Sequence, residues 1–202
     1  DLAGSNSLSD NTVWSINEAR DSTLWVGTNT ALNILDRRTG RWTNFKQEAG
    51  SQHAFRGRQV HAICEDKFRS NTFWLGTLDS GLIRFDRGKN RFVRHPLPSG
   101  PDHLYAIHQD REGILWLGTN SSGGLLAFDP ARKKFTSYGV QVQEAPAKKG
   151  WVLTIAAPRD SSNHSLWLGT WAGGLHVFDR INHTLKNFHS EASELHALAE
   201  HS

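Results

Sequence analysis

The chain has 202 residues, of which 37% are hydrophobic and 21% charged, and its formal net charge is +3. This length suffices for one large domain with a sizeable core, and the composition is that of a globular rather than a membrane-embedded protein. No stretch approaches the roughly 18 apolar residues that cross a bilayer, so direct membrane insertion by this segment is not expected. The positive charges are scattered, which argues against nucleic-acid binding but is compatible with an anionic ligand.

Cysteine usage gives little information about the compartment. Cys64 is the single cysteine, which excludes an intrachain disulfide. Its apolar setting in "VHAIC" predicts a buried, unreactive thiol. The chain starts at Asp1 and contains no methionine, and we expect it to be a processed or excised piece of a longer protein.

One four-part unit recurs along the chain at intervals of about 40 to 50 residues, a period typical of propeller blades. In the first unit, the run "VWSI" from Val13 is followed by "LWVGT" from Leu24, "ALNILD" from Ala31 and "RWTNF" from Arg41. The later units keep this order, and their counterparts of "LWVGT" contain Trp74, Trp116 and Trp167.

These segments are short, β-branched or aromatic in character, and bounded by Gly, Asn, Asp and Ser, and none has the length or period of a helix. Four short strands per unit predict an all-β fold, a β-propeller with four complete four-stranded blades. We expect the blades at about 12–46, 59–95, 103–138 and 151–189 of a single propeller region spanning 1–202. The segment 194–202 matches the first strand of a next blade, so we expect a fragment of a larger propeller, with a closed four-bladed ring as the alternative.

The repeated Trp-x-Gly-Thr phrase is interpreted as scaffold, because a feature copied into every blade serves the packing that all blades share. A large indole followed by no side chain lets the next blade pack closely. A ligand-binding tryptophan ladder is the alternative interpretation. The predicted structural residues are Trp25, Trp74, Trp116, Trp167, Gly27, Gly76, Gly118 and Gly169.

The segment from Leu104 to Tyr138, "LYAIHQDREGILWLGTNSSGGLLAFDPARKKFTSY", shows the unit most completely. Its order of opening strand, Asp-x-x-Gly turn, Leu-Trp-Leu-Gly-Thr and Gly-Leu strand ending in Asp resembles the two-component regulator propeller family. The leader "SLSDNTVWSI" resembles the linker between blades of that family. In the first unit Ser22 stands at the turn glycine and Ala31 replaces the glycine of Gly-Leu, and both departures weaken individual turns.

The resemblance implies a sensor region of a bacterial hybrid histidine kinase or diguanylate cyclase, in a periplasmic or other extracytoplasmic location. It implies no catalysis within this chain, further blades and an output domain in the parent chain, and no cofactor. The implied ligand is an oligosaccharide or another small anionic or polar molecule. A homo-oligomer that pairs open blade faces is a further expectation.

Candidate ligand residues are sought where the units differ, in the loops after the second strand and the linkers into the first strand, which emerge at one end of a propeller. Trp171 is an aromatic residue without a counterpart in the other units. Cationic donors for a carboxylate or sulfate come from the linkers: Arg56, Arg58, Lys148 and Lys149.

The second position of the innermost strand also varies between units. It is occupied in chain order by Trp14, His61, Tyr105, Leu153 and His196. These side chains either line the central channel and contact a ligand or fill space between blades, and the sequence leaves both interpretations open.

The alternatives to a sensor are weaker. The histidines have no metal-ligand spacing, so no metal site is predicted. A protein–protein interaction scaffold is the principal alternative function. A propeller glycosidase or lyase is a lesser one: "QDREGILW" is superficially similar to the Asp-box of sialidase propellers, but no arginine triad with Tyr and Glu can be nominated.

Overall fold

A computed structural model describes residues 6–47, 54–98, 103–120, 124–140, 150–158 and 164–188. In these ranges the strands form four four-stranded antiparallel sheets, each with its strands in chain order. The predicted all-β propeller fold is thereby confirmed for four blades, whereas the expected strand at 194–202 lies outside the described residues. The blades are β1–β4 (Val13–Glu18, Leu24–Thr28, Ala31–Asp36, Arg41–Lys46), β5–β8 (Val60–Glu65, Thr72–Thr77, Leu82–Asp86, Arg91–His95), β9–β12 (Leu104–Gln109, Leu115–Thr119, Gly124–Asp129, Lys134–Gly139) and β13–β16 (Val152–Ala156, Ser165–Thr170, Leu175–Asp179, Leu185–Phe188).

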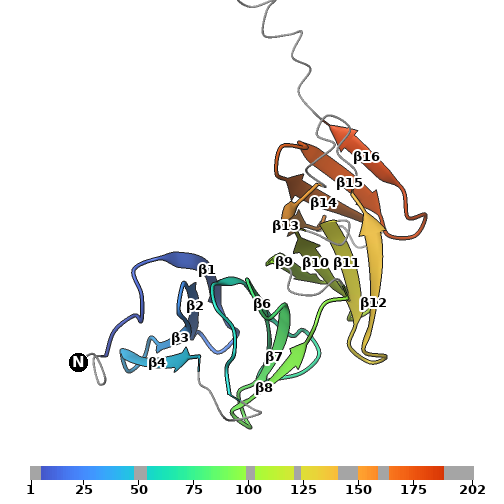
Figure 1. Ribbon diagram of the computed structural model, residues 1–202. Coiled ribbons are helices and arrows are strands. Elements are labelled where there is room, and N and C mark those ends of the chain that lie inside the picture. The colour runs from blue at the N-terminus through green and yellow to red at the C-terminus, as the bar shows by residue number, and fades with distance from the viewer. Residues whose placement is uncertain are drawn as a thin grey trace, which may run out of the picture.

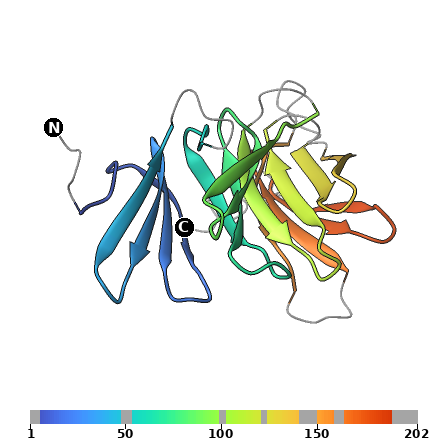
Figure 2. The same ribbon diagram turned by 90° about the horizontal axis from the view of Figure 1, so that it is seen from below.

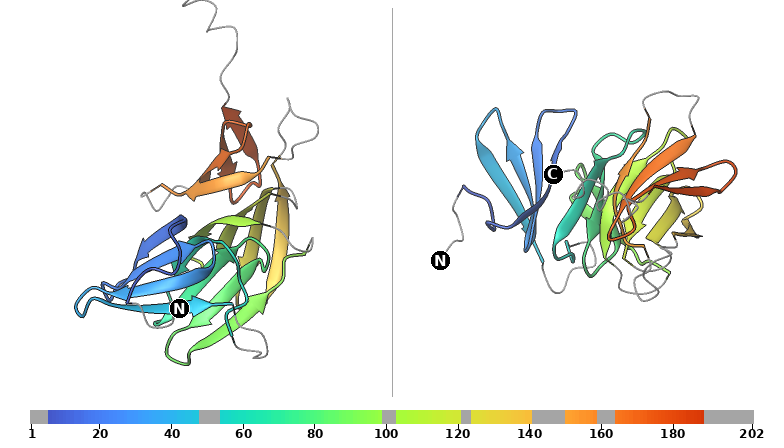
Figure 3. Two further views of the ribbon diagram at one scale, coloured as in Figure 1. Left: turned by 60° about the vertical axis from the view of Figure 1, so that its left-hand side comes forward. Right: turned by 90° about the horizontal axis from the view of Figure 1, so that it is seen from above.

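The blades follow one another around an arc (Figure 1). Their first strands are neighbours in chain order, with β1 beside β5, β5 beside β9 and β9 beside β13. Figure 3 shows the first blade (blue) and the fourth (orange to red) at the two ends of this arc. The first strands therefore face the inside of the arc.

Each blade has two chemically different ends. In the first blade the β1–β2 and β3–β4 turns point to the same side of the molecule (Figure 2). The β2–β3 loop and the linker into the first strand emerge at the opposite side. We call these two sides the turn end and the loop end.

The interfaces between blades are built by the tryptophans of the repeated phrase. Each indole lies against the phenylalanine of the third strand in the following blade, with ring centroids 5.5 to 5.9 Å apart. Burying such rings contributes about 2–3 kcal/mol each. Trp167 of the fourth blade is 40% exposed, and no following blade covers it in the described part of the chain. The pairs are Trp25–Phe85, Trp74–Phe128 and Trp116–Phe178.

Turn aspartates hold the indoles in place. The indole N–H of Trp74 donates to Asp66 Oδ2, and that of Trp116 to Asp110 Oδ2, both at 2.8 Å. In the first blade Trp25 donates instead to the hydroxyl of Thr23 at 2.9 Å. The polar end of each of these three indoles is thus satisfied at the turn end of its own blade.

The glycine of the phrase is required by the approach of the next blade. A Cβ on Gly76 would lie 2.8 Å from the carbonyl oxygen of Leu104, and one on Gly118 would lie 2.5 Å from that of Val152. Both oxygens belong to the first residue of the next inner strand. Backbone atoms cannot move aside as a flexible side chain would, so a side chain here forces adjacent blades apart.

The described residues contain no helix long and apolar enough to cross a membrane.

Cys64 in β5 is partly buried. Burial is the main reason that the pKa of its thiol rises to about 11. The thiol is therefore protonated at neutral pH, which favours the predicted lack of reactivity.

Substituting Gly118→Ala should lower the free energy of unfolding by about 2 kcal/mol, because the new methyl group meets the Val152 backbone. Gly139→Ala in β12 of the same blade is the matched control, since a Cβ there has no atom within 4 Å. Urea unfolding followed by tryptophan fluorescence measures both. Equal stabilities of the two variants would contradict this account of the interface.

A second prediction concerns acid stability. His95 in β8 contacts the rings of both Trp74 and Phe128, and its Nε2 is buried without a hydrogen-bond partner among the described residues. Burial first, and then the charges of Arg84 and Lys133, lower its pKa to about 4. In the unfolded chain the His95 imidazole has an ordinary pKa near 6.5, so it binds a proton at a higher pH than in the folded chain. The free energy of unfolding should therefore fall as the pH drops from about 6.5 toward 4.

His95→Phe keeps the aromatic packing and removes the titrating group. Its urea midpoint should therefore depend less on pH over this window than that of the unaltered chain. His61 contributes in the same direction and remains in the variant. An identical pH dependence of the two midpoints would show that His95 does not titrate as described.

Candidate functional site

The loop end is organised by one backbone hydrogen bond that recurs in every blade. The residue after the Gly-Thr pair donates its N–H to the carbonyl of a linker residue one position ahead of the inner strand, or two positions ahead in the second blade. In this way the β2–β3 loops and the linkers gather on one surface, as the sequence predicts. The bonds are Asn29 to Thr12, Leu78 to Arg58, Asn120 to His103 and Trp171 to Trp151, with lengths of 2.9 to 3.3 Å.

A β-bulge occurs at the same place in all four inner strands. In β1 the pairing jumps from Val13 to Ser15, which leaves Trp14 without a partner on β2. An extra residue of this kind turns its side chain away from the regular alternation of the strand, and bulges are frequent beside functional sites. The residues placed at the bulge are Trp14, His61, Tyr105 and Leu153, the varied second positions of the sequence analysis.

Three of these side chains form a continuous aromatic row across the first three blades. The ring of Trp14 stacks on His61, with centroids 4.5 Å apart and planes inclined by 22°. His61 in turn meets Tyr105 edge-on at 5.1 Å. The Tyr105 hydroxyl lies 3.1 Å from Nδ1 of His103, which ends the row. We call Trp14, His61, Tyr105 and His103 the aromatic row.

The aromatic row presents ring faces and polar edges together. Trp14 is 46% exposed, and His61 covers only one of its two faces. His61 Nε2 lies 3.2 Å from the amide oxygen of Gln59. Because an amide oxygen can only accept, this nitrogen carries the ring proton. The row can therefore offer an apolar surface for stacking and hydrogen-bonding groups beside it.

At neutral pH the centre of the row carries no charge. Burial, and secondarily the nearby His103, lowers the pKa of His61 to about 4. Burial also raises the pKa of Tyr105 above its ordinary value. A neutral imidazole and a neutral phenol favour a ligand that is recognised by stacking and hydrogen bonds.

The other predicted residues lie elsewhere on the loop end. Trp171 is 52% exposed and lies beside Trp151, with ring centroids 6.3 Å apart. Arg56 and Arg58 are exposed on the linker into β5. Three predicted positions fall outside the described residues: Lys148, Lys149 and His196.

The linker with the two arginines is fixed by its backbone. Ser80 donates its hydroxyl to the Arg56 carbonyl at 2.6 Å, and Asp79 accepts the N–H of Arg58 at 3.0 Å. These bonds join the linker to the β6–β7 loop. The linker therefore has a defined position on the loop end.

Sequence reasoning missed three residues of this surface: Gln59, His103 and Trp151. Gln59 and His103 are each two positions ahead of a bulge residue, and extended chain places such pairs on the same side. Trp151 stands two positions ahead of Leu153 in the same way. A search for aromatic and polar residues at that offset would have found all three.

No group of three or more His, Cys, Asp or Glu side chains suited to a metal ion occurs in the described ranges. What the loop end offers is aromatic surface with hydrogen-bonding groups beside it.

Segments 7–30 and 99–121 match the family model described as two component regulator propeller. This match confirms the resemblance found in the repeat. Over 125 residues the chain is 28% identical to a protein named Histidine kinase P4 from Formosa agariphila. That alignment covers 56% of this chain and 9% of the relative.

Solved structures share the fold. The extracellular domain of a putative hybrid two-component system from B. thetaiotaomicron matches with a TM-score of 0.73 and 24% identity, over 91% of this chain and 25% of that one. The extracellular domain of a putative one-component system from the same organism matches with a TM-score of 0.67 and 21% identity, over 88% of this chain and 22% of that one. Virginiamycin B lyase from Staphylococcus aureus matches with a TM-score of 0.68 and 12% identity, over 90% of this chain and 56% of that one. The chain thus spans about a quarter of each of the two B. thetaiotaomicron structures.

The description of His61 predicts its behaviour in NMR. Its ring proton resonances should titrate with a midpoint near 4, because the folded environment disfavours the charged imidazole. Trp14→Ala uncovers the ring and should raise this midpoint toward the ordinary value of about 6.5. The His61→Gln variant identifies the resonance. A midpoint near 6.5 in the unaltered chain would contradict the stacked, desolvated position.

Proposed function

We propose that this chain is the ligand-sensing propeller region of a bacterial two-component signalling receptor and that the loop end binds the ligand. The aromatic row carries the proposal, since a bulge repeated in every blade places Trp14, His61 and Tyr105 together on the inner strands. Sugar rings have apolar faces that pack on aromatic rings and hydroxyl groups that need hydrogen-bonding partners. An oligosaccharide is therefore the ligand class that the site supports best.

Several residues extend the proposed site. Trp171 adds a second exposed indole on the loop end. Arg56 and Arg58 would bind a carboxylate or sulfate group if the sugar carries one. Lys148 and Lys149 stay proposals of the same kind from sequence. Together these residues suit a polar or anionic oligosaccharide.

The receptor context is also part of the proposal. The family match and the extracellular sensor domains of similar fold support an extracytoplasmic location. They likewise support additional blades and an output domain in the parent chain, with no catalysis by this region. The sequence identity to virginiamycin B lyase is 12%, so this similarity supports a shared fold and not a shared activity. Signalling then requires that the ligand bind one arrangement of the receptor more tightly than another.

A thermal-shift screen against neutral and acidic oligosaccharides tests this function. A ligand at about 100 times its Kd should stabilise the chain by roughly 2.7 kcal/mol. Trp14→Ala and Trp171→Ala should reduce that shift, whereas Trp167→Phe, which alters an exposed indole away from the loop end, should retain it. Shifts unaffected by both loop-end variants would place the ligand elsewhere, and no shift with any sugar would favour a protein-binding scaffold.

A further inference from the structure

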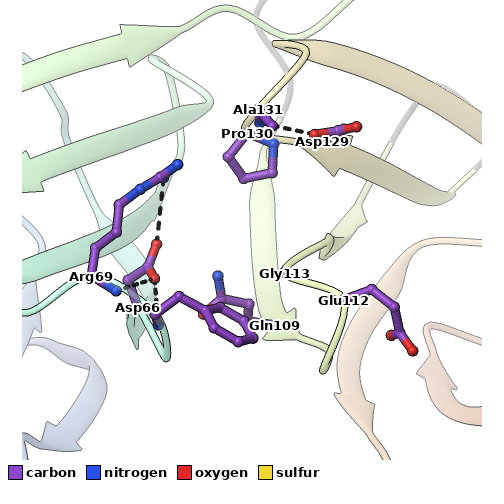
Figure 4. Close-up of a pocket in the computed structure, with 9 residues that line it drawn as sticks. Asp66, Arg69, Gln109, Glu112, Gly113, Asp129, Pro130 and Ala131 are labelled. Carbon is purple, nitrogen blue, oxygen red and sulfur yellow. Dashed lines mark hydrogen bonds and ion pairs between the residues drawn. The ribbon is translucent and has the colours of Figure 1, made fainter.

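A pocket of about 180 Å³ opens at the turn end, between the second and third blades. Its walls come from the β5–β6 turn of one blade and from the β9–β10 and β11–β12 turns of the next (Figure 4). The β5–β6 turn, "DKFRSNT", is longer than the "DREG" turn of the third blade. The pocket therefore depends on a feature that the blades do not share. Its lining residues include Phe68, Arg69, Gln109, Gly113 and Pro130.

The floor of the pocket is made by a contact that links neighbouring blades. In the first blade, Arg20 lies in the β1–β2 turn. Its backbone N–H donates at 2.9 Å to the carboxylate of Glu65, the last residue of β5 in the second blade. One blade later, Lys67 donates its N–H to the amide oxygen of Gln109 at 2.7 Å. The two bonds are equivalent in position. Only one oxygen atom of Gln109 is needed for this structural role.

Gln109 differs from Glu65 in having a donor group, and that donor is unused. The side chain is 2% exposed, and its bond from Lys67 fixes which end is oxygen. Within the described residues its amide nitrogen donates no hydrogen bond. Figure 4 shows this nitrogen directed into the pocket toward Pro130. This nitrogen is open to the pocket and does not belong to the sealed, unpaired polar atoms of the core, so it can donate to an acceptor that enters.

A second donor lines the same pocket. The carboxylate of Asp66 already accepts the indole N–H of Trp74 and the backbone N–H groups of Phe68 and Arg69. The Arg69 guanidinium reaches it only at 3.8 Å and is 46% exposed. Most N–H groups of Arg69 have no acceptor within the described part of the chain, so they can bind one from outside.

The acidic residues around the pocket have basic partners. Asp129 is paired with Arg132 at 2.6 Å, and Glu112 shares Arg180 with the closer Asp110, at 3.4 and 3.1 Å. The donors that remain for a ligand among the described lining residues are the Gln109 amide and the Arg69 guanidinium. Beside them lie the apolar surfaces of Pro130 and of Phe68, which is 61% exposed.

We propose that this pocket binds a small organic carboxylate. The carboxylate accepts hydrogen bonds from the Arg69 guanidinium and the Gln109 amide, which are planar donors suited to its two oxygens. The apolar body of the ligand packs against Phe68 and Pro130. This site is separate from the loop end and does not depend on the function proposed there.

The test is NMR titration of the chain with two probes that carry the same group, phenylacetate and glucuronate. Their uncharged counterparts, phenylacetamide and glucose, are the ligand controls. We expect shifts in the Gln109 side-chain amide and the Arg69 resonances with a carboxylate and not with its neutral counterpart. Whichever of the two acids binds more tightly shows whether the pocket prefers an aromatic or a sugar carboxylate. Neutral probes that bind as well as the acids, or no shifts at millimolar concentration of either acid, would overturn the proposal.

Gln109→Glu is an informative variant, because a carboxylate keeps the acceptor for Lys67, as Glu65 does for Arg20. It removes the donor and adds a negative charge that repels a carboxylate ligand, so we expect binding at least about tenfold weaker. Arg69→Gln should weaken binding similarly, whereas Arg38→Gln, which removes a charge from the distant β3–β4 turn, should not. Equal affinity in Gln109→Glu and the unaltered chain would falsify the proposed role of the amide.

Discussion

The close approach of one blade to the next, permitted by a missing side chain, is the constraint on which the rest of this structure depends. At Gly76 and Gly118 the carbonyl oxygen of the following inner strand occupies the space that a Cβ would need. This contact sets the spacing of the inner strands around the arc. Because that spacing is short, side chains at equivalent positions of adjacent blades touch, and the aromatic row is one result.

The scaffold and the sites use different residues of the same repeat. The tryptophans pack on the following blade and the turn aspartates accept their indole protons, so the repeated positions are occupied by structural contacts. The positions that vary are left for binding. At the bulge they place Trp14, His61 and Tyr105 in contact, and at the turn end they leave Gln109 and Arg69 with donors that no described residue uses. The two ends of the propeller thereby differ in chemistry, with ring surfaces at the loop end and hydrogen-bond donors at the turn end.

Departures from the repeat have local physical explanations. Ser22 adopts a positive φ of 64°, the left-handed conformation that glycine accepts more readily. Its counterpart Gly113 has a φ of 85°, so the substitution keeps the turn and adds strain. Ala31 is different, because its β2–β3 loop is shorter and it has no positive φ, whereas Gly81 and Gly174 in the longer loops do. The first blade avoids the need for glycine there by changing the loop.

From sequence alone, the period of the Trp-Gly-Thr phrase determined the strand order and the four blades, because strands and turns depend on residues close together in the chain. It also pointed to the varied second position of the inner strands. Only the tertiary structure decided that Trp14, His61 and Tyr105 touch, that His103 ends their row, and that Lys67 reaches Gln109. Apart from the His103–Tyr105 contact, these contacts join residues more than 40 positions apart, and they depend on the bulges and on the distance between blades. Both are set by packing across the interfaces, which no local pattern in the sequence records.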